Sequence, residues 1–307
     1  MRESSRDFLL IKPPRVWTVF LTYALSFILA GLISQTVLIT TVAWRSGSAS
    51  GSVTDMTEVN FQGASESESE VILRVGCEET VLGCAAVGLA FMSPASWRKR
   101  LRLVRPRISP LRQLVFSAGC PAIGFVFLSL AALNVGYQTQ TFQEDDKFHS
   151  RLTGGAIVIA VIVFGLLAGT AEELLFRGFI QTRLSDRWGP NKGVLWSSVL
   201  FGVTHFSDLP NVASAIGVGI YLGYVTERAN SVLPAIIGHV TNNAAMVLCT
   251  LDRMSSLGPR LNLLILCISI LTLRFSIHYL RPAAAGGMPS ALRGHAEGES
   301  SNGSSRK

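Results

Sequence analysis

The sequence predicts an all-α fold, a polytopic transmembrane helical bundle of about eight spans. Of its 307 residues, 49% are hydrophobic and only 15% are charged. A soluble domain has about 25% charged residues, so this chain has too few charges to cover the surface of a soluble protein of its size. Long apolar stretches also recur along the chain, as they do in polytopic membrane proteins. These two observations predict the fold class.

Each predicted span is an apolar stretch comparable in length to a membrane-crossing helix, which needs about 20 residues. The eight stretches lie at residues 16–42, 71–93, 113–135, 153–176, 193–206, 212–228, 231–250 and 258–280. The fifth has 14 residues, and we expect it to continue into flanking polar residues, to tilt or to lie inside the bundle. The second carries Arg74, Glu78 and Glu79 near its start. The first is too long for the apolar part of a cleavable signal peptide, so we expect it to remain as an anchor.

The placement of charge predicts the orientation in the membrane. Residues 1–15, 94–112 and 177–192 are rich in Arg and Lys, whereas the 46–70 loop is mainly acidic. The positive-inside rule places the three basic segments in the cytoplasm. With eight spans both termini are cytoplasmic, in a multi-pass protein of the cell membrane. Topology explains the basic segments better than nucleic-acid binding does, and contact with anionic lipid headgroups is a further expected role.

The chain divides into four expected regions. Residues 1–15 form a cytoplasmic segment, and residues 16–151 form the N-terminal transmembrane helices with a mobile loop at 45–70. Residues 152–280 form a transmembrane core in which polar residues concentrate. Residues 281–307 are rich in Gly, Ser and Ala and are expected to be a disordered cytoplasmic tail.

Three spans of the core carry polar side chains that are costly in a membrane and therefore indicate function. The fourth span has Glu172 and Glu173, with Arg177 at its end, the fifth ends at His205, and the seventh contains His239 and Asn243. Residues four apart share one face of a helix. This spacing pairs Glu173 with Arg177, Phe201 with His205, and His239 with Asn243.

The spacing also predicts which side chains meet. Glu172 is rotated by about 100° from Glu173 and so points elsewhere than the Glu173–Arg177 pair. We expect Glu172, His205, His239 and Asn243 to converge in one water-filled cavity that opens to the cytoplasm. Taken singly, each group has a structural explanation, as an ion pair or as a hydrogen bond between helices. Their occurrence together on three helices favours a functional site.

The predicted side chains suit hydrolysis. Glu172 could take a proton from a bound water, and a histidine could orient that water or protonate the leaving amine. Asn243, with a histidine, could donate hydrogen bonds to an oxyanion. The alternative is a divalent metal such as zinc, held by Glu172, His205 and His239, although the chain lacks the H-E-x-x-H pattern. No other cofactor is expected, and both mechanisms remain open.

Three short motifs resemble those of one family. "EELLFRG" at 172–178 resembles an E-E-x-x-x-R motif, "FGVTH" at 201–205 an F-x-x-x-H motif, and "HVTNN" at 239–243 an H-x-x-x-N motif. In this order they resemble the CPBP family, the CAAX-processing and bacteriocin-processing (Abi) membrane endopeptidases. The resemblance covers residues 165–250.

The resemblance implies an intramembrane endopeptidase, a peptide hydrolase of the metallo- or glutamate type. Glu172 would activate water, Glu173 and Arg177 would support it, and His205, His239 and Asn243 would complete the site. The implied substrate is a membrane-associated peptide or a lipidated protein, including prenylated CAAX-type proteins.

Two other functions fit the same residues. A non-catalytic membrane scaffold, or a binding protein of the bacteriocin-immunity type, could use the cavity to hold a partner. A transporter could use the Glu and His cluster to relay protons, but the chain shows no inverted repeat or paired broken helices. The intact set of polar residues favours the endopeptidase.

Overall fold

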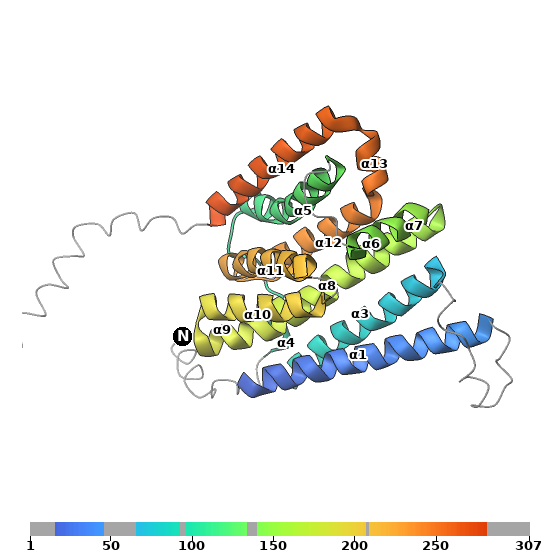
Figure 1. Cartoon of the computed structure of the whole chain (residues 1–307). Helices are drawn as coiled ribbons and strands as arrows, with labels where there is room; N and C mark the ends of the chain where they lie inside the picture. Colours follow the sequence, from blue (N-terminus) through green and yellow to red (C-terminus); the bar gives the residue numbers. More distant parts are fainter. Residues whose placement is uncertain (1–15, 46–65, 93–95, 134–139, 207–208, 281–307) are drawn as a thin grey trace, which may run out of the picture.

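The computed structural model describes residues 16–45, 66–92, 96–133, 140–206 and 209–280 (Figure 1). The expected N-terminal segment at 1–15, the loop at 46–65 and the tail at 281–307 lie outside these residues. The described chain is helical and contains no strand among its assigned elements. The elements are α1 (Val16–Arg45), α3 (Glu68–Phe91), α4 (Trp97–Arg100), α5 (Pro110–Ala132), α6 (Gln140–Arg151), α7 (Gly155–Ala160), η3 (Val161–Ala168), α8 (Gly169–Glu173), η4 (Leu174–Gln181), α9 (Thr182–Trp188), α10 (Pro190–Thr204), α11 (Leu209–Ala229), α12 (Leu233–Leu248), α13 (Leu251–Ser256) and α14 (Gly258–Leu280).

The protein is an all-α membrane bundle, and a helix lies at each of the eight predicted positions. Four helices are long and apolar enough to cross a membrane: Val16–Trp44, Pro110–Ala132, Gly155–Trp188 and Gly258–Leu280. The predicted count of eight spans is not confirmed. Charged residues lie in the first half of α3, and α10 and α12, with 15 and 16 residues, are shorter than the length of about 20 residues that a crossing needs.

The fourth predicted span is longer than expected. One helix runs without a break from α7 through η3, α8 and η4 to α9, so it ends at Trp188 and not near residue 176. The extra turns contain Arg177 and Gln181, but both side chains are fully buried by neighbouring helices. Tertiary burial therefore extends the helix beyond its apolar stretch. This long helix starts and ends in α-helix and contains two π-helical segments, η3 and η4.

Local sequence explains several helix boundaries. Ser67 and Glu70 form a capping box at the start of α3, in which the Ser67 backbone N–H donates to Glu70 Oε2 at 2.7 Å. Pro110 occupies the first turn of α5 after the cap residue Ser109. Gly189 separates α9 from α10 with φ of 87°, a conformation that suits glycine, and Pro190 follows it.

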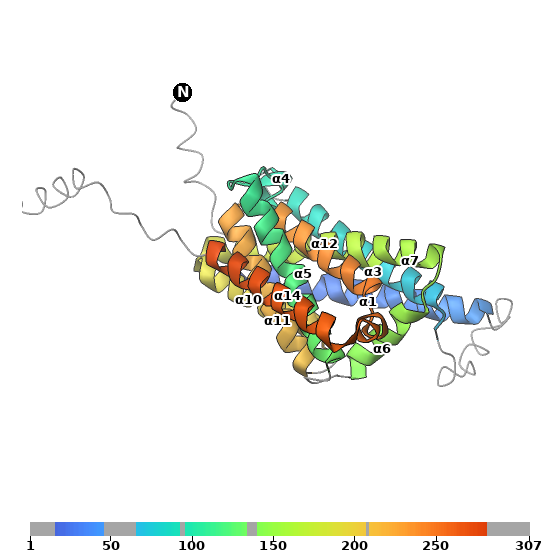
Figure 2. The same ribbon diagram turned by 90° about the horizontal axis from the view of Figure 1, so that it is seen from above.

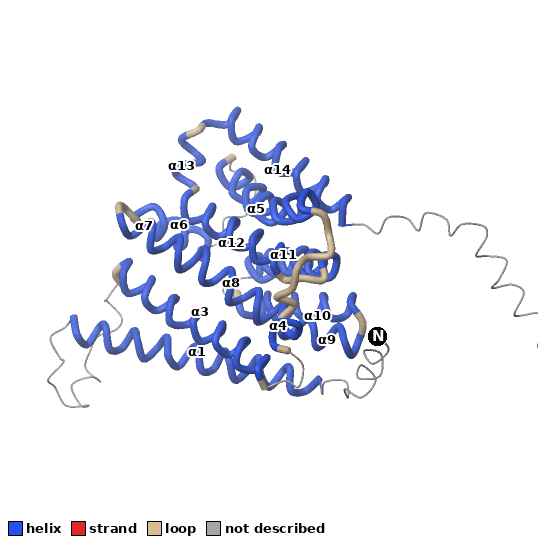
Figure 3. Tube along the Cα trace, turned by 180° about the vertical axis from the view of Figure 1, so that it is seen from behind, coloured by secondary structure: helices blue, strands red, loops and turns tan. Residues whose placement is uncertain are grey.

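The helices form successive layers (Figure 1). The pair α1 and α3 lies on one side, the long helix from α7 to α9 lies next to it, and α12 and α11 follow, with α5 and α14 on the opposite side. The view from above shows α14 and α5 in front of α11 and α12 (Figure 2). From behind, the loop after α4 runs along one end of the bundle (Figure 3). The long helix is therefore an interior element, packed by α3 on one side and by α12 on the other.

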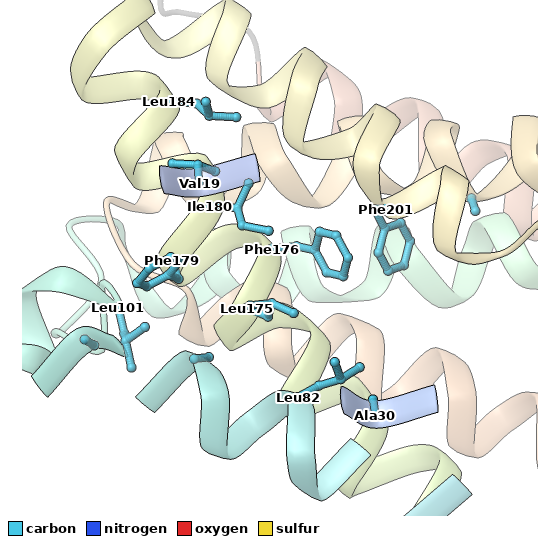
Figure 4. Close-up of a cluster of buried hydrophobic side chains, with 13 residues drawn as sticks. Val19, Ala30, Leu82, Leu101, Leu175, Phe176, Phe179, Ile180, Leu184 and Phe201 are labelled. Atoms are coloured by element: carbon cyan, nitrogen blue, oxygen red, sulfur yellow. The ribbon is translucent and has the colours of Figure 1, made fainter. Parts of the chain in front are cut away.

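A buried apolar cluster fixes this long helix against α1, α3 and α10 (Figure 4). Leu175, Phe176 and Ile180 are at most 1% exposed. Phe176 and Phe201 of α10 pack edge to face, with ring centroids 5.1 Å apart. Such aromatic pairs contribute about 0.5–1.5 kcal/mol beyond the area that they bury. The cluster holds the residues that follow Glu172 and Glu173 in a fixed rotation.

Candidate active site

Small residues bring α12 close to the long helix. A Cβ atom on Gly169 would lie 3.0 Å from the backbone N of Val240, and one on Gly165 would lie 3.3 Å from Ala244 Cβ. Gly165 and Gly169 form a G-x-x-x-G pattern, which allows close approach of helices in membranes. On its other side α12 meets α5 through Gly238, whose Cβ would lie 2.9 Å from Ser117 O. The next residue, His239, is thus held directly beside α8.

The two π-helical segments flank α8 and direct backbone carbonyls to side chains of other helices. In η3, Phe164 O accepts a hydrogen bond from Asn243 Nδ2 at 3.1 Å. In η4, Phe176 O accepts one from Ser197 Oγ at 2.9 Å. π-helical turns are rare and occur frequently at functional sites, because they change the rotation of the residues that follow. The glutamate pair lies on the α-helical turn between them.

Glu173 lies at the centre of the site. Its Oε1 is 2.9 Å from Arg177 Nη1 and also 2.9 Å from His239 Nδ1. The Glu173 and Arg177 side chains are fully buried, and His239 is 5% exposed. Since a carboxylate only accepts hydrogen bonds, Nδ1 of His239 carries the hydrogen that it donates to Glu173. Glu173 thereby fixes both the ring orientation and the tautomer of His239.

Glu172 faces the other nitrogen of the same ring. Its Oε2 lies 3.6 Å from His239 Nε2, and its side chain is 14% exposed. One imidazole therefore bridges two consecutive carboxylates, one fully buried and paired with Arg177, the other partly accessible. The sequence predicted that Glu172 would converge with His239 and that Glu173 would pair with Arg177 in a supporting role. It did not predict the contact between Glu173 and His239, which forms because His239 lies so close to α8 that its two ring nitrogens reach both glutamates.

Phe201 connects the three motifs through one buried ring. The Arg177 guanidinium lies 4.4 Å from the centre of this ring, and the rings of His205 and His239 have centroids 4.6 and 5.9 Å away. His205 Nδ1 donates to Phe201 O at 2.9 Å, which fixes the tautomer of this histidine at the end of α10. His205 thus approaches the Glu–His group from the side of the Phe201 ring.

Asn243 lies one helical turn beyond His239, as the spacing predicted. One N–H of its amide is used on Phe164 O, and its Oδ1 accepts a hydrogen bond from Asn242 Nδ2 at 3.1 Å. An asparagine amide has two N–H groups. In this arrangement Asn243 joins α12 to η3, a contact that sequence spacing did not predict.

A carboxyl group outside the three motifs also faces the site. Glu79 of α3 is 8% exposed, and it and its neighbour Glu78 interact electrostatically with Glu172. The sequence shows both as charged residues in a predicted span, but the distance to residue 172 along the chain gave no reason to place them together. The packing of α3 on α8 decides this contact.

The predicted zinc alternative has no support in this geometry. Across the described residues, no group of three or more His, Cys, Asp or Glu side chains is placed to hold an ion. Zinc ligands must all reach the ion at about 2 Å. Glu172 Oε2 and His239 Nε2 are 3.6 Å apart, but the structure does not bring His205 to the same point, and His205 Nδ1 is used on Phe201 O. Among the described residues, Glu172, His205 and His239 are therefore not arranged as a zinc-binding set.

Comparison with known families identifies the segment that carries the site. Residues 154–245 match the family model described as "Type II CAAX prenyl endopeptidase Rce1-like". The segment contains all three motifs, and the match confirms the predicted resemblance to the CPBP intramembrane proteases. No curated protein and no solved structure matches the chain. The match supports, in broad terms, a CAAX-type endopeptidase within a multi-pass membrane protein.

Proposed function

We propose that this chain, with its Rce1-like segment at 154–245, is an intramembrane endopeptidase that hydrolyses a peptide bond with a water molecule activated at Glu172. His239, held by Glu173 and Arg177, is the partner of Glu172. His205 and Asn243 complete the site. The substrate is a membrane-associated peptide or lipidated protein, and prenylated CAAX-type proteins are the first class to test.

One observation carries this proposal: the line of contacts from Arg177 through Glu173 and His239 to Glu172. A reactive group, a histidine and a third residue that orients the histidine form the recurring arrangement of hydrolytic sites. Here the first three side chains are buried and fixed, whereas Glu172, at the end of the line, is partly accessible. A general base needs both a partner and access to water, and Glu172 has both.

The side chains account for each proton in the reaction. Glu172 takes a proton from water while the water oxygen bonds to the carbonyl carbon, whose π electrons move to the carbonyl oxygen. When the C–N bond breaks, that proton passes to the leaving amine, either from Glu172 or through His239 Nε2. The second N–H of Asn243 is the expected donor to the oxyanion.

The test compares wild type with Glu172→Gln in liposomes, against a panel of prenylated and unprenylated membrane peptides, with and without a chelator. We expect Glu172→Gln to lower turnover by about 10²–10⁴-fold while the protein remains inserted, because a general base contributes about that much. Glu68→Gln, at an exposed carboxylate at the start of α3, is the control and should retain full turnover.

Full turnover in Glu172→Gln would overturn the role of this residue. Inactivation of wild type by the chelator would instead favour a metal mechanism. If folded wild-type protein cleaves no peptide of the panel, the non-catalytic scaffold becomes the better explanation of the same polar residues.

A further inference from the structure

Glu79 is a buried carboxyl group without a protein partner. It is 8% exposed, and no described residue donates a hydrogen bond to its Oε2. The other buried side chains on this helix are apolar: Ile72, Leu82, Ala86 and Ala90. An unpaired carboxylate in such surroundings is costly, and ionisable residues in membrane helices usually serve a function.

The packing of α3 directs Glu79 to the active site. Gly76 packs against Val163, and a Cβ atom on Gly76 would lie 3.6 Å from Val163 Cγ1. Gly83 packs against Ala171, and a Cβ atom on Gly83 would lie 3.3 Å from Ala171 Cβ. The two helices therefore run parallel in close contact. Glu79 lies between these two contact points, about one turn before the level of Ala171, the residue that precedes Glu172. Figure 1 shows α3 alongside α8.

Glu172, like Glu79, has a buried carboxyl oxygen without a hydrogen-bond partner among the described residues. Its Oε2 is buried and makes no hydrogen bond to any residue that the structure describes, the nearest partner being His239 Nε2 at 3.6 Å. Glu79 and Glu172 interact electrostatically, and the half-buried Glu78 is the other acidic group beside them. Buried polar atoms without protein partners require a bound water or a functional explanation. Two such carboxyl groups, on helices that pack against each other, define a place for one small polar molecule.

We propose that Glu79 is a positioning residue of the hydrolysis and holds the attacking water against Glu172 from the α3 side. This inference rests on the proposed function. The water donates one O–H to each carboxylate. As its oxygen bonds to the carbonyl carbon, Glu172 takes one proton, and the other O–H remains bonded to Glu79. The water is thereby oriented before the reaction, which is a large part of catalysis by positioning.

The first experiment measures kcat and KM of Glu79→Gln with a peptide that wild type cleaves. We expect kcat to fall about 10-fold or more, with KM unchanged, because the substrate still binds but the water is no longer held. Glu68→Gln makes the same chemical change at an exposed position on the same helix and should change kcat less than 2-fold. Equal kcat in Glu79→Gln and wild type would refute the positioning role.

The same variants separate this role from a structural one. Glu79→Gln replaces a buried carboxyl group, which has no hydrogen-bond partner among the described residues, with an amide of the same size, so its melting temperature in detergent should equal or exceed that of wild type. A residue that only stabilised the fold would give the opposite result, with a lower melting temperature. Glu79→Asp keeps the carboxyl group and should recover part of the lost kcat.

A second experiment does not depend on cleavage. Melting temperatures are measured for Glu79→Gln, Glu172→Gln and the double variant. If the two carboxyl groups face each other, the change in melting temperature of the double variant will differ from the sum of the changes in the two single variants, as expected for residues that share partners. A change equal to that sum would refute the contact. A wild type that cleaves nothing would count against the proposed function alone, because the thermal cycle still decides whether Glu79 faces Glu172.

Discussion

At the residue scale, the Phe201 ring is the apolar centre around which the charged groups are arranged. It is 2% exposed and packs against Arg177, His205 and His239, which come from three different helical segments. A cation above an aromatic face is worth about 0.5–2 kcal/mol, more when it is buried. Arg177 is fully buried and has one acidic partner, Glu173, so the ring supplies much of its remaining contact. The side chain therefore orients residues that the proposed chemistry uses.

Replacing Phe201 with leucine should impair turnover beyond its effect on stability. The smaller side chain leaves Arg177 and both histidines without their common contact, and displacements of about 1 Å can cost 10²-fold in rate. We expect kcat of Phe201→Leu to fall about 10-fold or more. Phe116→Leu is the matched control, because Phe116 is 1% exposed and belongs to a different apolar cluster.

Both phenylalanine variants should lower the melting temperature in detergent, since each removes a buried ring. Only Phe201→Leu should lose turnover in a cleavage assay per folded molecule. If the two variants retain the same kcat, the ring has no orienting role.

At the scale of elements, the contact between the long helix and α12 decides whether the site forms. Neither helix carries the whole site, because Glu172 and Glu173 belong to α8 and His239 to α12. Gly169 lies against Val240, the residue after His239. The absence of a side chain at residue 169 is therefore a condition for the 2.9 Å contact between Glu173 and His239.

Alanine at two glycines of the same long helix should have opposite effects. Glycine to alanine in a helix usually stabilises by about 0.5–1 kcal/mol. Gly155→Ala should follow this rule, because a Cβ there meets nothing within 4 Å. Gly169→Ala should lower both melting temperature and turnover, because its Cβ would lie 3.0 and 3.1 Å from the backbone N and Cα of Val240 and would displace α12.

Thermal unfolding and the cleavage assay measure these two effects on the same protein samples. A Gly169→Ala variant that is as stable and active as Gly155→Ala would show that the close approach of the two helices is not required.

At the scale of the whole molecule, the basic loop after α4 and both ends of the described chain lie at the same end of the bundle. Phe20 near the start of α1 packs on Trp188, with ring centroids 6.4 Å apart, and Arg228 Nε donates to Leu280 O at 2.6 Å at the end of α14. The basic loop after α4 lies at the same end, where Arg102 Nη1 is 2.9 Å from Glu227 Oε1. The described parts of the two basic segments at 94–112 and 177–192, which the positive-inside rule assigns to the cytoplasm, thus lie together, although their side of the membrane stays a prediction.

Glu227 fastens the basic loop to the bundle. Its Oε1 lies 2.9 Å from Arg102 Nη1 and accepts hydrogen bonds from Gln181 Nε2 at 2.9 Å and Ser185 Oγ at 3.0 Å. The basic loop and the long helix, which are far apart in sequence, are therefore joined to α11 at one carboxylate. We expect Glu227→Ala to destabilise the protein by about 1.5–3 kcal/mol, the value of hydrogen bonds to a charged group.

The measurement is thermal unfolding in detergent, together with limited trypsin digestion after Arg107, which should become faster. Asp186→Ala is the control, because Asp186 is half-exposed and lies 3.7 Å from Arg100, a geometry worth at most about 1 kcal/mol. Unchanged digestion in Glu227→Ala would mean that other contacts hold the loop.

The sequence by itself determined the fold class, the position of each main helix and the three motifs that match the Rce1-like segment. These features are local, because apolar length and the four-residue spacing of Glu173 and Arg177 can be read within one segment. It also showed that His239 and the glutamates are costly in a membrane and so indicate a site.

Only the tertiary structure decided how the helices are rotated against one another. The two π-helical segments, the position of His239 between Glu172 and Glu173, and the approach of Glu79 all depend on it. So does the continuation of the long helix to Trp188. The physical reason is that contacts between helices depend on how closely two backbones approach, and that distance is set by side chains far apart in the sequence, such as Gly169 and Val240.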